Sequence, residues 1–120
     1  MMARPQRRDI VCPVELTFNL VGGRWKAMIM WHLLENQKLR FGELQRIVSE
    51  GAHEDAPKIS SRILSKQLTE LEEDGLICRV SYPEKIPRVE YTPTEKGISL
   101  KEILLLSYQW GLTERAQLSG

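Results

Sequence analysis

The stretch SSRILSKQLTELEEDG, residues 60–75, has the pattern of one amphipathic helix. Ser60 is a favourable residue for the N-cap, and Gly75 is a favourable residue just after a helix end. Four apolar residues recur at the spacing of a single helical face: Ile63, Leu64, Leu68 and Leu71. The pattern therefore predicts a helix that ends before Gly75 and turns one apolar face toward a core.

The charges of this predicted helix are ordered against its dipole. Positions 60–69 carry Arg62 and Lys66 and no acid, whereas all the acids lie in the remainder: Glu70, Glu72, Glu73 and Asp74. The amino end of a helix is its positive pole, so this order is disfavoured by about 0.3–1 kcal/mol per group. A function that requires cations near the amino end would explain the arrangement.

The face opposite the leucines suits the major groove of DNA. Arg62, Ser65, Lys66 and Thr69 share it at the spacing i, i+3, i+4 and i+7, and Ser61 precedes them in the first turn. Arg and Lys bind guanine edges or phosphates, and Ser and Thr bind either. We expect these five residues to contact DNA, with the acids directed away from the phosphates. The alternative is a solvated face whose charges are segregated by chance.

The rest of the chain predicts a winged helix. Helices are expected at 13–21, 24–36 and 41–48, then the helix quoted above, two extended runs at 76–82 and 88–94, and a last helix from about residue 95. Prolines in PEKIP between the extended runs suit a hairpin tip. The order helix, helix, helix, helix, hairpin, helix predicts a mainly α (α+β) winged helix-turn-helix with a C-terminal dimerisation helix.

Other cations extend the predicted DNA surface. Lys85 and Arg88 flank the hairpin tip, where a wing meets the DNA backbone or the minor groove. Arg24 and Lys26 lie at the start of a helix, where free amides favour anions, and are expected to be lesser phosphate contacts.

The last helix has more apolar residues than one packing face needs. The surplus would be an exposed apolar patch in a monomer, and a two-fold dimer buries it and supplies two recognition helices for a pseudo-palindromic site. The predicted interface comprises Leu100, Ile103, Leu104, Tyr108 and Trp110. The alternative is a helix absorbed wholly by its own core.

We divide the chain into a basic arm at 1–11 and a single DNA-binding domain at 12–120, which includes a dimerisation helix at about 95–117.

Composition limits the classes of function. The chain has 120 residues, 42% of them hydrophobic and 28% charged, with a net charge of +1, so any DNA surface must be local. Two cysteines, no export signal and no apolar run long enough to span a bilayer predict a cytoplasmic protein without membrane contact. No recognisable catalytic set, metal-ligand spacing or cofactor motif is present, and the acidic loop at 50–55 lacks firm ligand spacing. We expect no enzyme activity, cofactor or metal.

Cys12 is the most chemically suggestive side chain. It precedes a predicted helix, and Arg7 and Arg8 are near in sequence; both features favour the thiolate that oxidants attack. Cys12 is thus a candidate redox sensor, and the alternative is a small residue packed at a helix start. Cys78 falls in an extended apolar run, where we expect burial without chemistry.

Five segments together resemble the HxlR-type family of bacterial winged-helix transcription regulators. They are CPVE (12–15), GGRWK (22–26), LRFGEL (39–44), ISSRILSKQLTELEEDGLI (59–77) and YPEKIPRVEYTPTEKG (82–97). The resemblance implies a dimer, a recognition helix at about 60–73 and a wing around 82–90. Some family members sense oxidants or electrophiles through a cysteine at the position of Cys12. The chain departs from the family at 49–58, where the family has a shorter turn.

The predicted function is a homodimeric, sequence-specific transcription regulator that binds double-stranded DNA and responds to thiol chemistry through Cys12. One alternative is a winged-helix module for protein–protein association without specific DNA binding, which the modest net charge favours. Another is a thiol-dependent enzyme, which would require a general base beside Cys12, and the sequence shows none there. The sequence identifies neither the operator nor a small-molecule effector.

Overall fold

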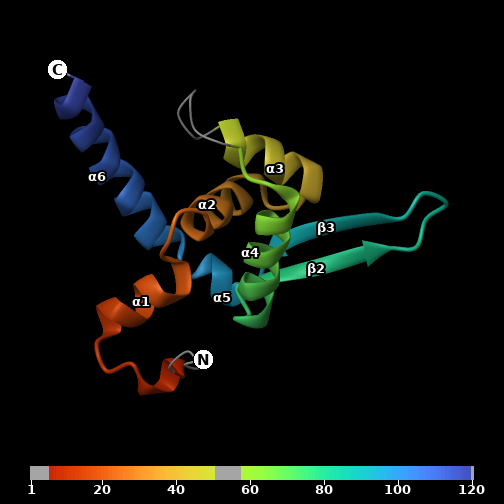
Figure 1. Cartoon of the computed structure of the whole chain (residues 1–120), viewed down its shortest axis with the longest axis horizontal. Coiled ribbons are helices and arrows are strands. Elements are labelled where there is room, and N and C mark those ends of the chain that lie inside the picture. The colour runs from red at the N-terminus through yellow and green to blue at the C-terminus, as the bar shows by residue number, and fades with distance from the viewer. Residues whose placement is uncertain (1–5, 51–57, 120) are drawn as a thin grey trace.

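Helices dominate the structure, a computed structural model that describes residues 6–50 and 58–119. In chain order its elements are η1 (Arg7–Asp9), α1 (Pro13–Val21), α2 (Lys26–Asn36), β1 (Leu39–Arg40), α3 (Phe41–Glu50), α4 (Ser61–Glu73), β2 (Ile77–Tyr82), β3 (Arg88–Pro93), α5 (Glu95–Ile98) and α6 (Lys101–Ser119). The order agrees with the predicted helices and hairpin, and Figure 1 shows a helical body from which the β2–β3 hairpin extends. The predicted winged-helix architecture is confirmed.

The core lies between α2, α3, α4 and the start of β2. Its fully buried side chains are aliphatic residues and one methionine: Ile29, Met30, Leu33, Leu44, Val48, Ile59, Leu64, Leu68, Leu71, Leu76 and Ile77. Burying one such side chain contributes roughly 1.5–3 kcal/mol to folding. Three residues of α2 belong to this set, Ile29, Met30 and Leu33, so this helix lies at the centre of the fold.

The quoted helix forms as its ends predict. The Ser60 hydroxyl accepts a hydrogen bond from the backbone N–H of Ile63 at 3.1 Å, so Ser60 is the N-cap of α4. Gly75 follows the helix with φ +75°, a conformation that favours glycine. One expectation is wrong: Ile63 is 42% exposed, because it lies at the edge of the leucine face rather than within it.

The sheet has three antiparallel strands in the order β1–β3–β2. The hairpin register runs from Ile77 opposite Pro93 to Tyr82 opposite Arg88. β1 pairs with the other edge of β3, with Leu39 opposite Tyr91. β1 was not predicted, since two residues are too few to show strand alternation.

The predicted last helix is two helices. Thr94 caps α5 by accepting a hydrogen bond from the N–H of Gly97 at 3.1 Å. Gly97 packs so closely on the chain that an added Cβ would lie 2.2 Å from the carbonyl oxygen of Leu76. After this contact the N–H of Leu100 bonds to the carbonyl of Gly97, which tightens the turn, and α6 starts in a new direction at Lys101.

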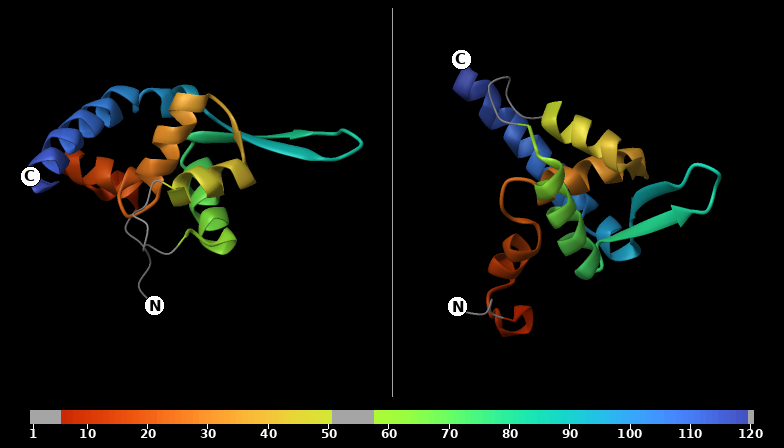
Figure 2. Two further views of the ribbon diagram at one scale, coloured as in Figure 1. Left: turned by 90° about the horizontal axis from the view of Figure 1, so that it is seen from above. Right: turned by 45° about the vertical axis from the view of Figure 1, so that its right-hand side comes forward.

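The wing and the two outermost helices lie at opposite ends of the molecule. Figure 2 shows α1 and α6 on the side away from the β2–β3 hairpin in both views, with α4 between them and the wing. Throughout residues 6–50 and 58–119, every helix is too short or too polar to cross a bilayer.

Candidate nucleic-acid interface

The amino half of α4 presents free cations. Arg62, Ser65, Lys66 and Thr69 are all exposed, as expected from their position opposite Leu64, Leu68 and Leu71. Within the described residues, neither Arg62 nor Lys66 takes part in an ion pair. Two positive side chains and two hydroxyls are therefore available to an external anion.

Two acids at the carboxyl end of α4 pair inside the protein, whereas Glu72 and Glu73 are exposed. Lys26 Nζ lies 2.5 Å from Glu70 Oε2, and Arg7 pairs with the carboxylate of Asp74. The side chain of Lys26 is only 7% exposed, because it reaches under α4 to Glu70. The expectation that Lys26 contacts a DNA phosphate is therefore wrong; it is an internal partner of α4.

Hydrogen bonds from α3 fix the start of α4. The side-chain amide of Gln45 donates to the carbonyl of Ile59 at 3.2 Å and to Ser61 Oγ at 3.1 Å. The N–H of Ile59 donates to Ser49 Oγ at 3.3 Å. These bonds join the two helices of the helix-turn-helix directly. Residues 51–57, which make up most of the longer segment at 49–58 and of the acidic loop at 50–55, lie outside the described residues.

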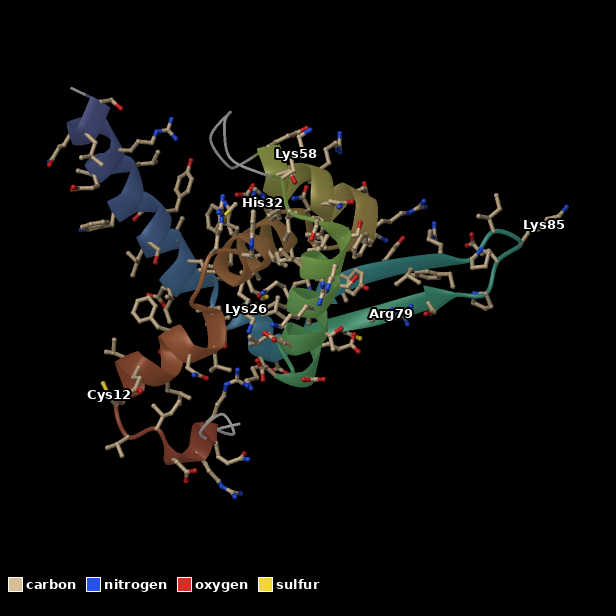
Figure 3. The ribbon with its side chains drawn as sticks, in the orientation of Figure 1. Cys12, Lys26, His32, Lys58, Arg79 and Lys85 are labelled. Atoms are coloured by element: carbon tan, nitrogen blue, oxygen red, sulfur yellow. The ribbon has the colours of Figure 1, made fainter. Side chains whose placement is uncertain are left out.

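The wing tip carries one free cation and one that is already paired. Lys85 is exposed and points away from the tip (Figure 3). Arg88 Nη2 instead lies 3.4 Å from Glu84 Oε1, and Arg88 Nε lies 3.4 Å from Glu90 Oε1. The guanidinium carbon of Arg88 also lies 4.4 Å from the ring centre of Tyr82. Arg88 thus braces the hairpin internally and is not free to anchor the wing as expected, whereas the DNA contact of the exposed Lys85 stays a prediction.

Two further arginines are exposed outside α4 and the wing tip. Arg79 is exposed on β2 and lies beside α4 in Figure 3. It was not among the expected contacts, since a single arginine on a strand is usually solvated. Two residues after the buried Ile77, it lies on the same face of β2 as Ile77. Arg24 is exposed in the turn before α2, with its guanidinium 4.8 Å from the ring centre of Trp25.

The residues expected in a dimer interface divide into two groups. Leu104 belongs to the core of its own domain, and Leu100 packs against that core, so these two expectations are corrected. Ile103, Tyr108 and Trp110 are exposed, and Trp110 is 70% exposed. The ring of Tyr108 also stacks on Trp31 of α2 at a centroid distance of 5.0 Å, which holds α6 on the body.

Apolar side chains that sequence reasoning missed extend this surface. Val14 and Phe18 of α1 are exposed, Phe18 to 66%, and so is Leu106 of α6. Val14 and Phe18 are apolar residues one helical turn apart in α1, a spacing that indicates an apolar helix face. This pattern is weaker than the apolar excess of α6.

Both cysteines are free and exposed. Cys12 is the N-cap residue of α1, and it lies at the outer end of that helix in Figure 3. Arg7 was expected to favour the thiolate of Cys12, but its side chain has other partners. Its Nε donates to Asn19 Oδ1 at 2.8 Å, and its Nη1 pairs with Asp74. The expected burial of Cys78 is wrong: it lies on the edge strand β2, on the face opposite the buried Ile77.

His32 is a titratable group of the described residues whose pKa is shifted. Burial of His32 in α2 lowers its pKa below the usual value of 6.5, an effect that the neighbouring carboxylate of Glu35 partly opposes. The part of the chain that the structure describes has no group of three or more His, Cys, Asp or Glu residues that could hold a metal ion.

Known proteins share this sequence and this fold. The family model described as HxlR-like helix-turn-helix matches residues 20–118. The HTH-type transcriptional regulator YybR of Bacillus subtilis is 40% identical over 104 residues, which cover 87% of this chain and 76% of YybR. The redox regulator HypR in its reduced form has a TM-score of 0.77 and 39% identity, over 90% of this chain and 98% of HypR.

A second solved regulator gives the same result. The reduced form of the transcriptional regulator YodB from B. subtilis has a TM-score of 0.67 and 33% identity, over 84% of this chain and 91% of YodB. The helix-turn-helix with its wing, the match over residues 20–118 and these relatives agree with the resemblance drawn from the sequence motifs. The chain belongs to the HxlR-like helix-turn-helix family of transcription regulators.

Proposed function

We propose that this protein is a cytoplasmic, homodimeric regulator that binds a specific sequence in double-stranded DNA by inserting α4 into the major groove. One observation carries the proposal: Arg62 and Lys66 are exposed without an ion-pair partner among the described residues, whereas Glu70 and Asp74 of the same helix are paired within the protein. The helix thus directs its two cations outward, and two of the four acids at its carboxyl end are paired within the protein.

Each part of the surface has a distinct role in the proposed complex. Arg62 and Lys66 bind base edges or phosphates. Ser61, Ser65 and Thr69, whose side chains are shorter, hydrogen-bond to bases or phosphates that lie close to α4. Lys85 at the wing tip reaches the neighbouring backbone or minor groove. Arg79 and Arg24 add phosphate contacts at the border, which raise affinity without sequence preference.

The proposed dimer forms through α1 and α6. Exposed aromatic and aliphatic side chains at that end support it, namely Val14, Phe18, Ile103, Leu106, Tyr108 and Trp110. A two-fold axis through this end, opposite the wing, leaves both copies of α4 free (Figure 2). Two-fold related helices bind half-sites about 34–36 Å apart, so the operator is expected to be a pseudo-palindrome.

The DNA contact is tested with fragments selected from genomic DNA by the wild-type protein. Replacing Arg62 with Ala is expected to weaken binding to a selected fragment by about 1–3 kcal/mol and to relax the preference at one base pair. Arg8→Ala is the matched control, since Arg8 is an exposed arginine of η1, outside the helix-turn-helix, the wing and α6. Equal affinity of wild type and Arg62→Ala for the selected fragment would refute the role of Arg62.

The same titrations distinguish a protein–protein module. DNA binding releases counterions, so the affinity of a DNA-binding protein for random duplex falls as salt is added. We expect that fall for the wild-type protein. Weak duplex association that does not change with salt would instead favour a winged helix that binds other proteins.

The regulator is also proposed to respond to oxidants through Cys12. This is supported by the exposure of Cys12 and by the similarity to HypR, which is described as a redox regulator. Diamide treatment is expected to change the DNA affinity of wild type and of Cys78→Ser, which removes the other exposed thiol, but not that of Cys12→Ser. A Cys12→Ser variant that responds like wild type would contradict the assignment.

A further inference from the structure

Arg7 connects the N-terminal segment to the end of α4. Its Nη1 pairs with the Asp74 carboxylate, and its Nε donates to Asn19 Oδ1 of α1 at 2.8 Å. The Asp74 side chain is only 10% exposed, and among the described atoms its second oxygen has no hydrogen-bond partner. A nearly buried carboxylate with one charged partner depends strongly on that partner.

Asp74 lies at the junction between α4 and the wing. It is the C-cap residue of α4, and β2 begins three residues later at Ile77. Its backbone carbonyl accepts a hydrogen bond from Lys96 Nζ at 2.7 Å, and the carbonyl of Gly75 accepts one from Thr94 Oγ1. α5 and its cap therefore hold the backbone of this junction, while Arg7 holds the Asp74 side chain.

We propose that Arg7 is a positioning residue for DNA recognition, which fixes the angle between α4 and the wing by holding Asp74. This inference rests on the proposed function, in which α4 and the tip of the hairpin contact one duplex at the same time. Only the short segment 74–76 joins α4 covalently to β2 of the wing. A small change of backbone angle in this segment therefore displaces the wing tip relative to α4. Arg7 then sets sequence specificity without touching DNA.

The proposal differs from a basic arm that contacts phosphate directly. If Arg7 bound phosphate, Arg7→Ala would weaken binding to every duplex and reduce the salt slope by about one. Asp74→Asn would strengthen binding, since it removes a negative charge that repels DNA. If Arg7 acts through Asp74, both substitutions weaken binding to the specific site, even though they change the net charge in opposite directions.

The experiment measures dissociation constants for a selected fragment and for a random duplex over a range of salt concentrations. Arg7→Ala and Asp74→Asn are each expected to weaken specific binding about fivefold, with random-duplex affinity and salt slope unchanged. The double variant is expected to be no weaker than the weaker single variant, because both substitutions break the same contact. The matched control Arg8→Ala removes an exposed arginine of η1 and is expected to bind as wild type.

Several results would overturn the inference. These are tighter binding by Asp74→Asn, additive losses in the double variant, or a loss in Arg7→Ala that is equal for specific and random duplex. If Asp74→Asn does not fold, Arg7→Lys replaces it; this variant keeps a cation opposite Asp74 and is expected to restore specific binding, whereas affinity as low as that of Arg7→Ala refutes the role. Wild-type protein that binds no duplex refutes the proposed function itself, while wild type and Arg7→Ala that bind equally refute only this inference.

Discussion

The two halves of α4 differ in where their charges find partners. In the amino half, Arg62 and Lys66 are exposed and make no ion pair within the described residues. In the carboxyl half, Glu70 pairs with Lys26, and Asp74 pairs with Arg7. An order of charges that opposes the helix dipole thus meets two separate requirements: two of the acids, Glu70 and Asp74, attach the helix to its own domain, and the cations remain available to a partner outside it.

The largest effect on stability is expected when the ion pair between Glu70 of α4 and Lys26 is removed. Glu70→Gln removes the carboxylate opposite Lys26 and leaves an ammonium group that is nearly buried, which is expected to lower the free energy of unfolding by about 2 kcal/mol. Glu72→Gln is the matched control, since it removes the same charge from an exposed position of the same helix, and its effect is expected to stay within about 0.5 kcal/mol.

Urea denaturation measures both variants at one protein concentration, because the stability of the proposed dimer would depend on concentration. Equal unfolding free energies for Glu70→Gln and Glu72→Gln would show that the two halves of α4 do not differ as described.

A smaller effect is expected at the amino end. Ser60→Ala removes the hydroxyl that accepts the N–H of Ile63, and it is expected to cost about 1 kcal/mol of stability. Ser65→Ala changes the same residue type on the exposed face of α4 and is expected to cost nothing, since alanine has the higher helix propensity. Circular dichroism during urea unfolding compares the two. A loss in Ser65→Ala as large as that in Ser60→Ala would indicate that this serine has a structural role as well.

The sequence was sufficient where a local pattern determines the structure. The leucine spacing, Ser60 and Gly75 predicted α4 with both of its ends, and the prolines of PEKIP predicted the hairpin tip. The exposure of Arg62 and Lys66 followed from the same periodicity, because a helical face opposite a buried one faces solvent. Local propensity and packing agree in this part of the chain.

The sequence was insufficient where a residue depends on a distant element. Lys26 was expected to contact DNA, because nothing near it in sequence indicates that Glu70 lies opposite. Arg88 was likewise expected to contact DNA, and it pairs with Glu90 instead. The division between α5 and α6 follows the close contact of Gly97 with Leu76, which is a tertiary contact with no local signal. Charged pairs and close backbone approaches are therefore what the structure adds.

The smallest expected effect on stability has the opposite sign and tests the origin of the charge order directly. Arg62 lies in the first turn of α4, where the helix dipole favours an acid. Arg62→Glu is therefore expected to raise the free energy of unfolding by about 0.5 kcal/mol while it abolishes specific DNA binding. Arg62→Gln removes the cation without adding an acid, so about half of that gain is expected. Thermal unfolding at low and high salt measures the gain, which must shrink as salt screens the dipole. If Arg62→Glu instead destabilises the protein, Arg62 stabilises the native fold, and its place at the positive pole needs no DNA to explain it.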